Sequence, residues 1–107
     1  MRILFDQGTP VPLRRAFDGH IVETAFERGW SQLENGALIQ SAESSGFDVY
    51  VTTDKNLRFQ QNLTGRRLAI LVLWTTSWPA IKPHADGVAV AALALQQGEI
   101  RELDRPS

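Results

Sequence analysis

The chain has 107 residues, of which 43% are hydrophobic and 21% are charged, and its formal net charge is −1; these values are typical of one globular domain. It contains no cysteine, which excludes disulfides, thiolate zinc sites and cysteine nucleophiles and fits the reducing cytoplasm. No apolar stretch approaches the ~18 residues that a membrane span needs, and the first residues do not resemble a secretion signal, so we expect neither membrane spanning nor secretion.

The order of apolar runs, helical patterns and turn residues predicts that strands and helices alternate along the chain. The predicted strands are short runs rich in aliphatic or β-branched residues, and the predicted helices have apolar residues at helical spacing. In chain order the elements are a strand over 2–5, a short helix over 9–17, a strand over 20–24, one helical turn over 25–29, a helix over 33–45, a strand over 48–52, a brief helix over 57–63, a strand over 68–74, an alanine-rich helix over 81–97, an edge strand over 98–103 and a frayed tail over 103–107.

Some of these boundaries carry typical capping residues. Thr9 is the expected cap of the first helix, with Pro10 at its first position. Gly46 is placed to end the helix over 33–45, and Ser77 to begin the last helix. The nearly unbroken aliphatic run Leu68–Trp74 is typical of a central parallel strand that is covered on both faces.

Alternating strands and helices predict a single three-layer α/β domain over residues 1–107, with a mostly parallel central sheet. In open parallel sheets, ligands bind beyond the carboxyl ends of the strands. Asp6 follows the first predicted strand and Asp54 follows the third. Both acids are therefore expected at the same edge of the sheet.

Carboxylates that converge at such an edge form a hard-oxygen site suited to Mg²⁺ or Mn²⁺. A metal ion held there activates water and stabilises the charge that builds on a phosphodiester. Each acid also has a structural interpretation, because aspartate in a D-x-G loop often closes a turn and aspartate before a helix often caps it. The pattern leaves both interpretations open, and it places Thr52 and Thr53 where they can hydrogen-bond a carboxylate.

The run Val51-Thr52-Thr53-Asp54-Lys55-Asn56-Leu57, with Ile3-Leu4-Phe5-Asp6 near the start of the chain, resembles the V-T-x-D-x-x-L signature and first strand of PIN-like domains. The resemblance covers most of residues 1–75 and points to the short PIN-like proteins of unknown function that are related to VapC-type toxin ribonucleases. It implies a Rossmann-like sheet and a metal-dependent ribonuclease centre, in which Asp6 is the first acid and Asp54 is the acid of T-x-D.

The chain departs from this family's acidic set. The acid that begins the helix ending near Ala42 falls on Asn35, which is a weaker metal ligand and cannot act as a base. Glu34 lies one residue earlier and would substitute if the helix began there, whereas the second acid that many members carry after the first is Gln7 here. The set implied for metal binding and catalysis is Asp6, Asp54 and Glu34, with Asn35 as a further metal ligand.

A nearly neutral chain has no overall attraction for nucleic acid, so RNA binding needs a local group of cations. Arginine suits bidentate contacts with phosphate; the alternative is that these arginines are ordinary solvated residues. Among the residues that flank the segments expected near the acidic edge, Arg58 is the first choice. The candidates are Arg14, Arg15, Arg58, Arg66 and Arg67.

Aromatic residues and other motifs add little. Trp30 and Trp78 stand beside serine in predicted loops and are candidates to stack on bases, whereas Trp74 is expected to pack in the core. His20 and His84 have no partners at metal-ligand spacing and are interpreted as structural. No G-x-S-x-G, P-loop or dinucleotide-binding glycine motif is present, so those enzyme classes lack their signals.

Two functions remain. The first is a Mg²⁺- or Mn²⁺-dependent ribonuclease of PIN-like type, acting as the toxin of a toxin–antitoxin pair, with RNA and an antitoxin-like protein as partners. The alternative is a PIN-like module with an incomplete acidic set that binds a protein or RNA without cleaving it. The alanine-rich last helix and the tryptophans would suit a homodimer.

Overall fold

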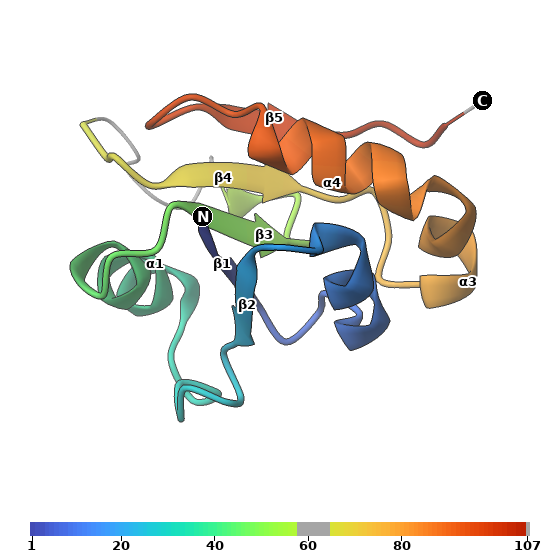
Figure 1. Ribbon diagram of the computed structural model, residues 1–107. Coiled ribbons are helices and arrows are strands. Elements are labelled where there is room, and N and C mark those ends of the chain that lie inside the picture. The colour runs from blue at the N-terminus through green and yellow to red at the C-terminus, as the bar shows by residue number, and fades with distance from the viewer. Residues whose placement is uncertain (58–64, 107) are drawn as a thin grey trace.

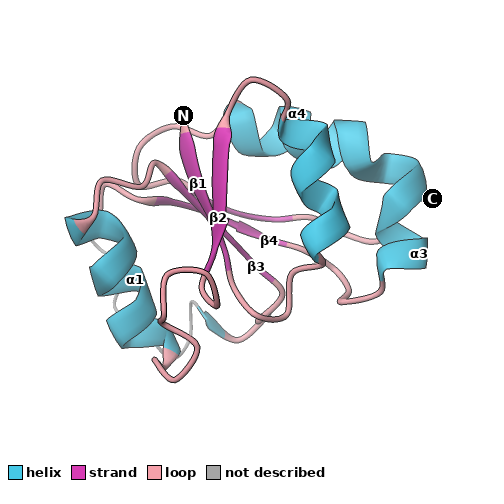
Figure 2. Cartoon of the chain, turned by 60° about the horizontal axis from the view of Figure 1, so that its bottom comes forward, coloured by secondary structure: helices cyan, strands magenta, loops and turns pink. Residues whose placement is uncertain are grey.

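The computed structural model describes residues 1–57 and 65–106, and these form three layers, with a sheet between two sets of helices (Figures 1 and 2). The strands of the described residues are β1 (Arg2–Phe5), β2 (Ile21–Thr24), β3 (Val49–Thr52), β4 (Ala69–Val72) and β5 (Ile100–Glu102). The helices are η1 (Val11–Phe17, 3-10), α1 (Asn35–Ser44), α3 (Trp78–Ile81), η2 (Lys82–His84, 3-10) and α4 (Ala85–Leu93).

All neighbouring strands of the sheet are parallel, in the order β2-β1-β3-β4-β5. The prediction of an α/β domain with a largely parallel sheet is confirmed. The chain moves outward from β1 to β2 and then returns across β1 to β3, so the direction of winding reverses between β1 and β3. In open α/β sheets such a reversal leaves a crevice at the carboxyl ends of the two central strands, where ligands bind.

Two apolar cores, one on each face, hold the sheet between its helices. On β3 the side chains alternate, because Val49 and Val51 face η1, α3 and α4 while Tyr50 faces α1. Strands buried on both faces read as continuous aliphatic runs, which is why β4 and its flanks were recognisable in the sequence. Figure 2 shows α1 on one side of the strands and α3 and α4 on the other.

The helix predicted over 81–97 is interrupted. Pro83 lacks a backbone N–H and clashes with a continuous α-helix, and the chain forms α3, η2 and α4 in succession instead. The expected cap at the start is present, since the Ser77 hydroxyl accepts a hydrogen bond from the Ala80 backbone N–H at 3.4 Å. Gly46 also ends α1 as expected, with a φ of +84° that favours glycine.

Other boundaries differ from the prediction in smaller ways. The helix expected from Thr9 is the 3-10 helix η1, whose N-cap is Pro10, because the Thr9 hydroxyl is used elsewhere. Leu103 is not part of a frayed tail: its backbone N–H donates to the Val72 carbonyl at 2.8 Å and its side chain packs on the core. Nearly all of the brief helix expected over 57–63 lies outside the described residues. No helix in the part of the chain that the structure describes is long and apolar enough to cross a membrane.

Candidate functional site

Asp6 and Asp54 lie at the same carboxyl edge of β1 and β3, as the sequence predicts, and Thr52 hydrogen-bonds to the side chain of the first and the backbone of the second. The register pairs Phe5 with Val51, which brings Asp6 beside Thr52. The buried Thr52 hydroxyl donates to Asp6 Oδ2 at 2.5 Å and accepts the Asp54 backbone N–H at 3.1 Å. The two acidic loops are therefore fixed relative to each other at the point where the winding of the sheet reverses.

The Asp6 carboxylate closes the turn that follows β1. Its Oδ1 accepts the Thr9 backbone N–H at 3.0 Å and lies 2.6 Å from the Thr9 hydroxyl. That hydroxyl also lies 3.0 Å from the Val51 carbonyl, but its single proton favours the shorter contact with the charged oxygen. The structural interpretation of a D-x-G aspartate is thus confirmed, and the carboxylate is held in one orientation.

A close approach of the two loops explains the glycine in this turn. A Cβ atom on Gly8 would lie 2.4 Å from the Thr53 hydroxyl oxygen, closer than real Cβ contacts allow. A larger residue would force either the Thr53 hydroxyl or the loop after β1 to shift. Gly8 therefore lets the Asp6 turn pack directly on the segment that carries Asp54.

The Asp54 carboxylate is bound by side-chain and backbone donors of two elements. Its Oδ2 accepts the side-chain amide of Asn35, the first residue of α1, at 2.5 Å. Its Oδ1 accepts the Asn56 backbone N–H at 3.0 Å. Asn35 thus joins the site through Asp54, whereas Glu34 is exposed at the N-cap position of α1.

A buried tyrosine lies beneath the two acids. Tyr50 is fully buried on β3, and among the described residues its hydroxyl has no hydrogen-bond partner of regular geometry. Burial first, and then the negative charges of Asp6 and Asp54, raise the pKa of this hydroxyl far above its ordinary value; the nearby Thr52 opposes that rise. The Tyr50 hydroxyl is consequently neutral and close enough to both carboxylates to feel their charge, and it donates no hydrogen bond of regular geometry to the described residues.

The two carboxylates of the site are suitable ligands for a divalent cation. A carboxylate offers about four lone-pair positions, and among the described residues three donor groups occupy Asp6 and two occupy Asp54. Both acids therefore keep oxygen lone pairs open. Mg²⁺ is commonly bound by one or two carboxylates and completes its shell with water and substrate phosphate.

In the part of the chain that the structure describes, the site has no third acid. In residues 1–57 and 65–106 no group of three or more histidine, aspartate or glutamate side chains is placed to hold a metal ion. The structure thus does not bring Glu34 together with Asp6 and Asp54. Gln7, which directly follows Asp6, donates its side-chain amide to the Ser31 carbonyl at 2.7 Å.

The arginines expected near the acids are distributed over both edges of the sheet. Arg14 lies on η1 and contacts Glu27, just after β2, with Nη2 and Oε1 2.5 Å apart; Arg15 is exposed on the same helix. Arg66 does not lie at the acidic edge, because it precedes β4 and contacts Gln40 and Glu43 near the end of α1. In a parallel sheet, residues that precede a strand lie at the amino-terminal edge of the sheet, and the two acids lie at the carboxyl edge. Arg58 lies outside the described residues.

A groove of about 570 Å³ opens beside Asp6, and it contains a residue that the sequence did not single out. Phe26, in the turn after β2, is 78% exposed. Trp30 and Trp78, the predicted stacking residues, are partly buried against the two cores. Its position as an aromatic residue in a predicted turn is the signal in the sequence that could have identified Phe26. The groove is lined by Asp6, Gln7, Thr9, Val11, Thr24, Phe26, Ser31 and Gln32.

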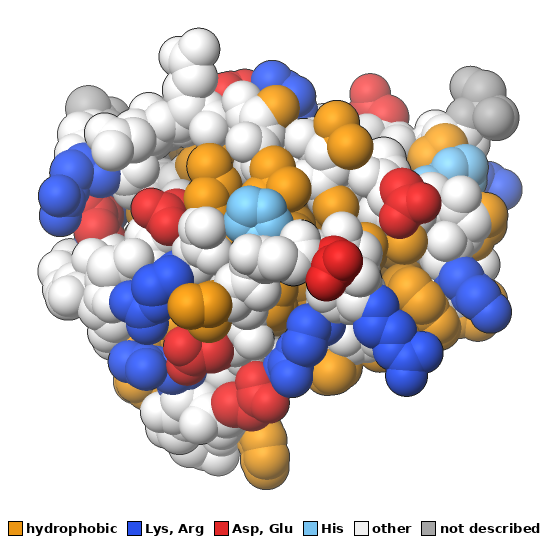
Figure 3. All heavy atoms as spheres, viewed as in Figure 1, with side chains coloured by type: hydrophobic (Ala, Val, Ile, Leu, Met, Phe, Trp, Pro, Cys, Tyr) orange, Lys and Arg blue, Asp and Glu red, His pale blue; other side chains and the backbone are white. Residues whose placement is uncertain are grey.

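Comparisons of the chain with protein-family models, with curated proteins and with solved structures found no match. The functional interpretation accordingly depends on the geometry and chemistry of this site. Over the face shown in Figure 3, acidic and basic side chains are interspersed, in keeping with the net charge of −1.

The bridge through Thr52 can be tested with an isosteric substitution. Thr52→Val removes the hydroxyl and leaves Asp6 Oδ2 without that donor, so we expect the free energy of unfolding to fall by about 1–2 kcal/mol. Thr76→Val, the same change at an exposed position, is expected to stay within ~0.5 kcal/mol of the wild type. Urea denaturation measures both, and equal stabilities of the two variants would contradict the bridge.

The raised pKa of Tyr50 predicts how stability depends on pH. The unfolded chain loses the tyrosine proton near pH 10 while the folded chain keeps it, so stability is unaffected below that pH and falls above it, by about 1.4 kcal/mol per pH unit. Tyr50 is the only tyrosine, so tyrosinate absorbance reports this residue alone. It should appear near pH 10 in urea, and in the native protein only on unfolding.

Tyr50→Phe provides the control for other groups that titrate at high pH. This variant should lack the additional loss of stability above pH 10. It should be at least as stable as the wild type at neutral pH, because a buried hydroxyl without a partner is unfavourable. Native tyrosinate near pH 10 would show that the hydroxyl is not buried.

Proposed function

We propose that the protein is a divalent-metal-dependent ribonuclease, with Asp6 and Asp54 as the residues that hold the ion. One observation carries the proposal: two aspartates lie at the reversal of a parallel sheet, both hydrogen-bonded to Thr52, and each carboxylate keeps lone pairs open. The resemblance of residues 1–75 to PIN-like domains supports RNA as the substrate and a toxin–antitoxin pair as a context.

The neighbouring side chains would orient this pair of acids. Thr9 and Thr52 donate to Asp6, and Asn35 donates to Asp54, so the carboxylates need little rearrangement to accept an ion. Two like charges at one edge repel each other, and a cation removes that repulsion. When bound, Mg²⁺ or Mn²⁺ activates water and neutralises charge on a phosphodiester.

Tyr50 adds a neutral donor beneath the acids. Its hydroxyl is buried and unpartnered among the described residues, and its raised pKa keeps the proton in place. Because the hydroxyl is enclosed by protein, it would act on a bound ion or phosphate through its dipole, without exchanging a proton.

The alternative function is a module that binds RNA or a protein without catalysis. The specific observation in its favour is that both acids already have structural hydrogen bonds, since Asp6 closes the Thr9 turn and Asp54 accepts the Asn56 backbone N–H. Asn35 in place of a third acid has the same implication. Under this alternative the carboxylates stabilise loops and hold no ion.

Metal titration separates the two functions. If the acids hold an ion, Mn²⁺ at about 100 times its dissociation constant adds ~2.7 kcal/mol to the stability of the fold, which raises Tm by roughly 10 °C in a domain of this size. Asp6→Asn and Asp54→Asn should each abolish this rise and Mn²⁺-dependent cleavage of single-stranded RNA. The matched control is Asp86→Asn, at an exposed position on α4, which should retain both.

The opposite result is equally specific. If Mn²⁺ and Mg²⁺ leave Tm unchanged, the wild type leaves RNA intact, and Asp6→Ala or Asp54→Ala unfolds at a higher temperature than the wild type, the acids are merely crowded. The proposal of a nuclease is then wrong and the binding module is favoured.

A further inference from the structure

The groove beside Asp6 has the size of a small-ligand site. Its volume of about 570 Å³ lies within the range of known ligand pockets. Its wall combines polar side chains with the apolar side chains of Val11 and Phe26. Because Asp6 is part of the wall, a molecule in the groove would lie next to this carboxylate.

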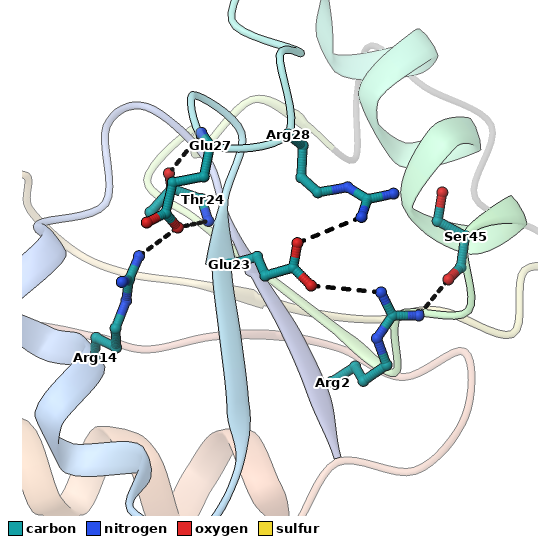
Figure 4. Close-up of polar contacts among 7 residues, drawn as sticks. All are labelled: Arg2, Arg14, Glu23, Thr24, Glu27, Arg28 and Ser45. Carbon is teal, nitrogen blue, oxygen red and sulfur yellow. Dashed lines mark hydrogen bonds and ion pairs between the residues drawn. The ribbon is translucent and has the colours of Figure 1, made fainter.

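Phe26 is held in its exposed position by a fixed turn. The Glu27 carboxylate accepts the Thr24 backbone N–H at 2.9 Å, and the Thr24 hydroxyl accepts the Glu27 backbone N–H at 3.1 Å. Arg14 then binds Glu27 from η1 (Figure 4). These donors keep the pKa of Glu27 below its usual value, so the carboxylate stays charged and the contacts persist at neutral pH.

The neighbouring ion pairs fix the strand that carries this turn. Glu23 on β2 lies 3.5 Å from an Arg2 nitrogen and 3.4 Å from an Arg28 nitrogen, and the other side of the Arg2 guanidinium donates to the Ser45 carbonyl (Figure 4). The Arg28 guanidinium carbon also lies 4.7 Å from the centre of the Trp30 ring, so the face of that ring is covered. Phe26 is the exposed ring that lines this groove.

The other wall residues offer hydrogen bonds at the edge of a flat ligand. Gln32 is exposed and lines the groove, and its amide supplies two donors and an acceptor. Gln7 uses its amide nitrogen on Ser31, which leaves its oxygen as an acceptor. An aromatic face with amides at its side matches a nucleobase, which has a planar π-surface and a polar edge.

We propose that this groove binds a base of single-stranded RNA, stacked on Phe26, next to the phosphodiester at Asp6 and Asp54. The proposal rests on RNA as the substrate class of the proposed function. A protein partner is less well matched, because the core of a protein interface is largely apolar and only Val11 accompanies Phe26 in this groove. Phe26 would act by positioning the strand, and it takes no part in bond cleavage.

Binding of labelled oligoadenylate RNA at low salt, with Ca²⁺ in place of Mn²⁺ to balance the acids and with the RNA checked on a gel to be intact, tests the proposal by fluorescence anisotropy. Phe26→Ala should weaken binding about tenfold, the loss expected for one base–aromatic stack, whereas Phe26→Trp should retain it. An oligomer of the same charge without bases should bind weakly, and equally to wild type and Phe26→Ala. Val90→Ala, at an apolar position that is 68% exposed on α4, is the matched control.

The outcomes distinguish this proposal from the proposed function. Loss of RNA binding in Phe26→Ala with no RNA cleavage by the wild type supports the groove and contradicts the nuclease. Cleavage that depends on Asp6, with oligonucleotide affinity unchanged in Phe26→Ala, overturns the groove alone. Absence of RNA binding by the wild type would also overturn the groove proposal. So would loss of self-association in Phe26→Ala without any change in RNA affinity, because that result would mark the ring as a protein contact.

Discussion

The pairing of β1 with β3 is the constraint on which the rest of the site depends, and the Thr52 hydroxyl transmits it to the acids. Thr52 is the last residue of β3, and its hydroxyl has one proton to donate and lone pairs to accept with. It donates to the carboxylate that follows β1 and accepts from the backbone that follows β3. A shift in the register of these strands would therefore separate Asp6 from the Thr52 hydroxyl and from the loop that carries Asp54.

Structural and chemical roles coincide in the two acids. Each carboxylate closes its own turn, which explains its conformation without any ligand. The same hydrogen bonds fix the carboxylates in position, and a pre-oriented site loses less entropy when an ion or substrate binds. The Tyr50 hydroxyl has no partner of regular geometry among the described residues. A purely structural role does not explain this feature, because a buried polar group without a partner costs free energy.

Much of the fold was predictable because its strands are local apolar runs and its helix ends carry local caps. The predicted strand over 68–74 contains β4, and Ser77 caps the next helix as expected. The prediction of one helix over 81–97 failed because it passed over a local signal, Pro83, which divides the segment. The prediction of the Thr9 cap failed because a tertiary partner outweighed the local signal: the Thr9 hydroxyl binds Asp6 rather than capping η1. A capping residue can be recognised locally, but its actual partner depends on what the fold brings within reach.

The sequence alone determined that Asp6 and Asp54 follow buried strands, because hydrophobic patterning and turn residues act over a few positions. Only the tertiary structure decided that those strands are neighbours, since strand order is set by which helices cover which face. The same packing turned Asn35 toward Asp54 and placed Arg66 at the opposite edge. It also left Phe26 exposed in a groove beside Asp6. These placements arise from contacts between segments far apart in the chain, which no local pattern records.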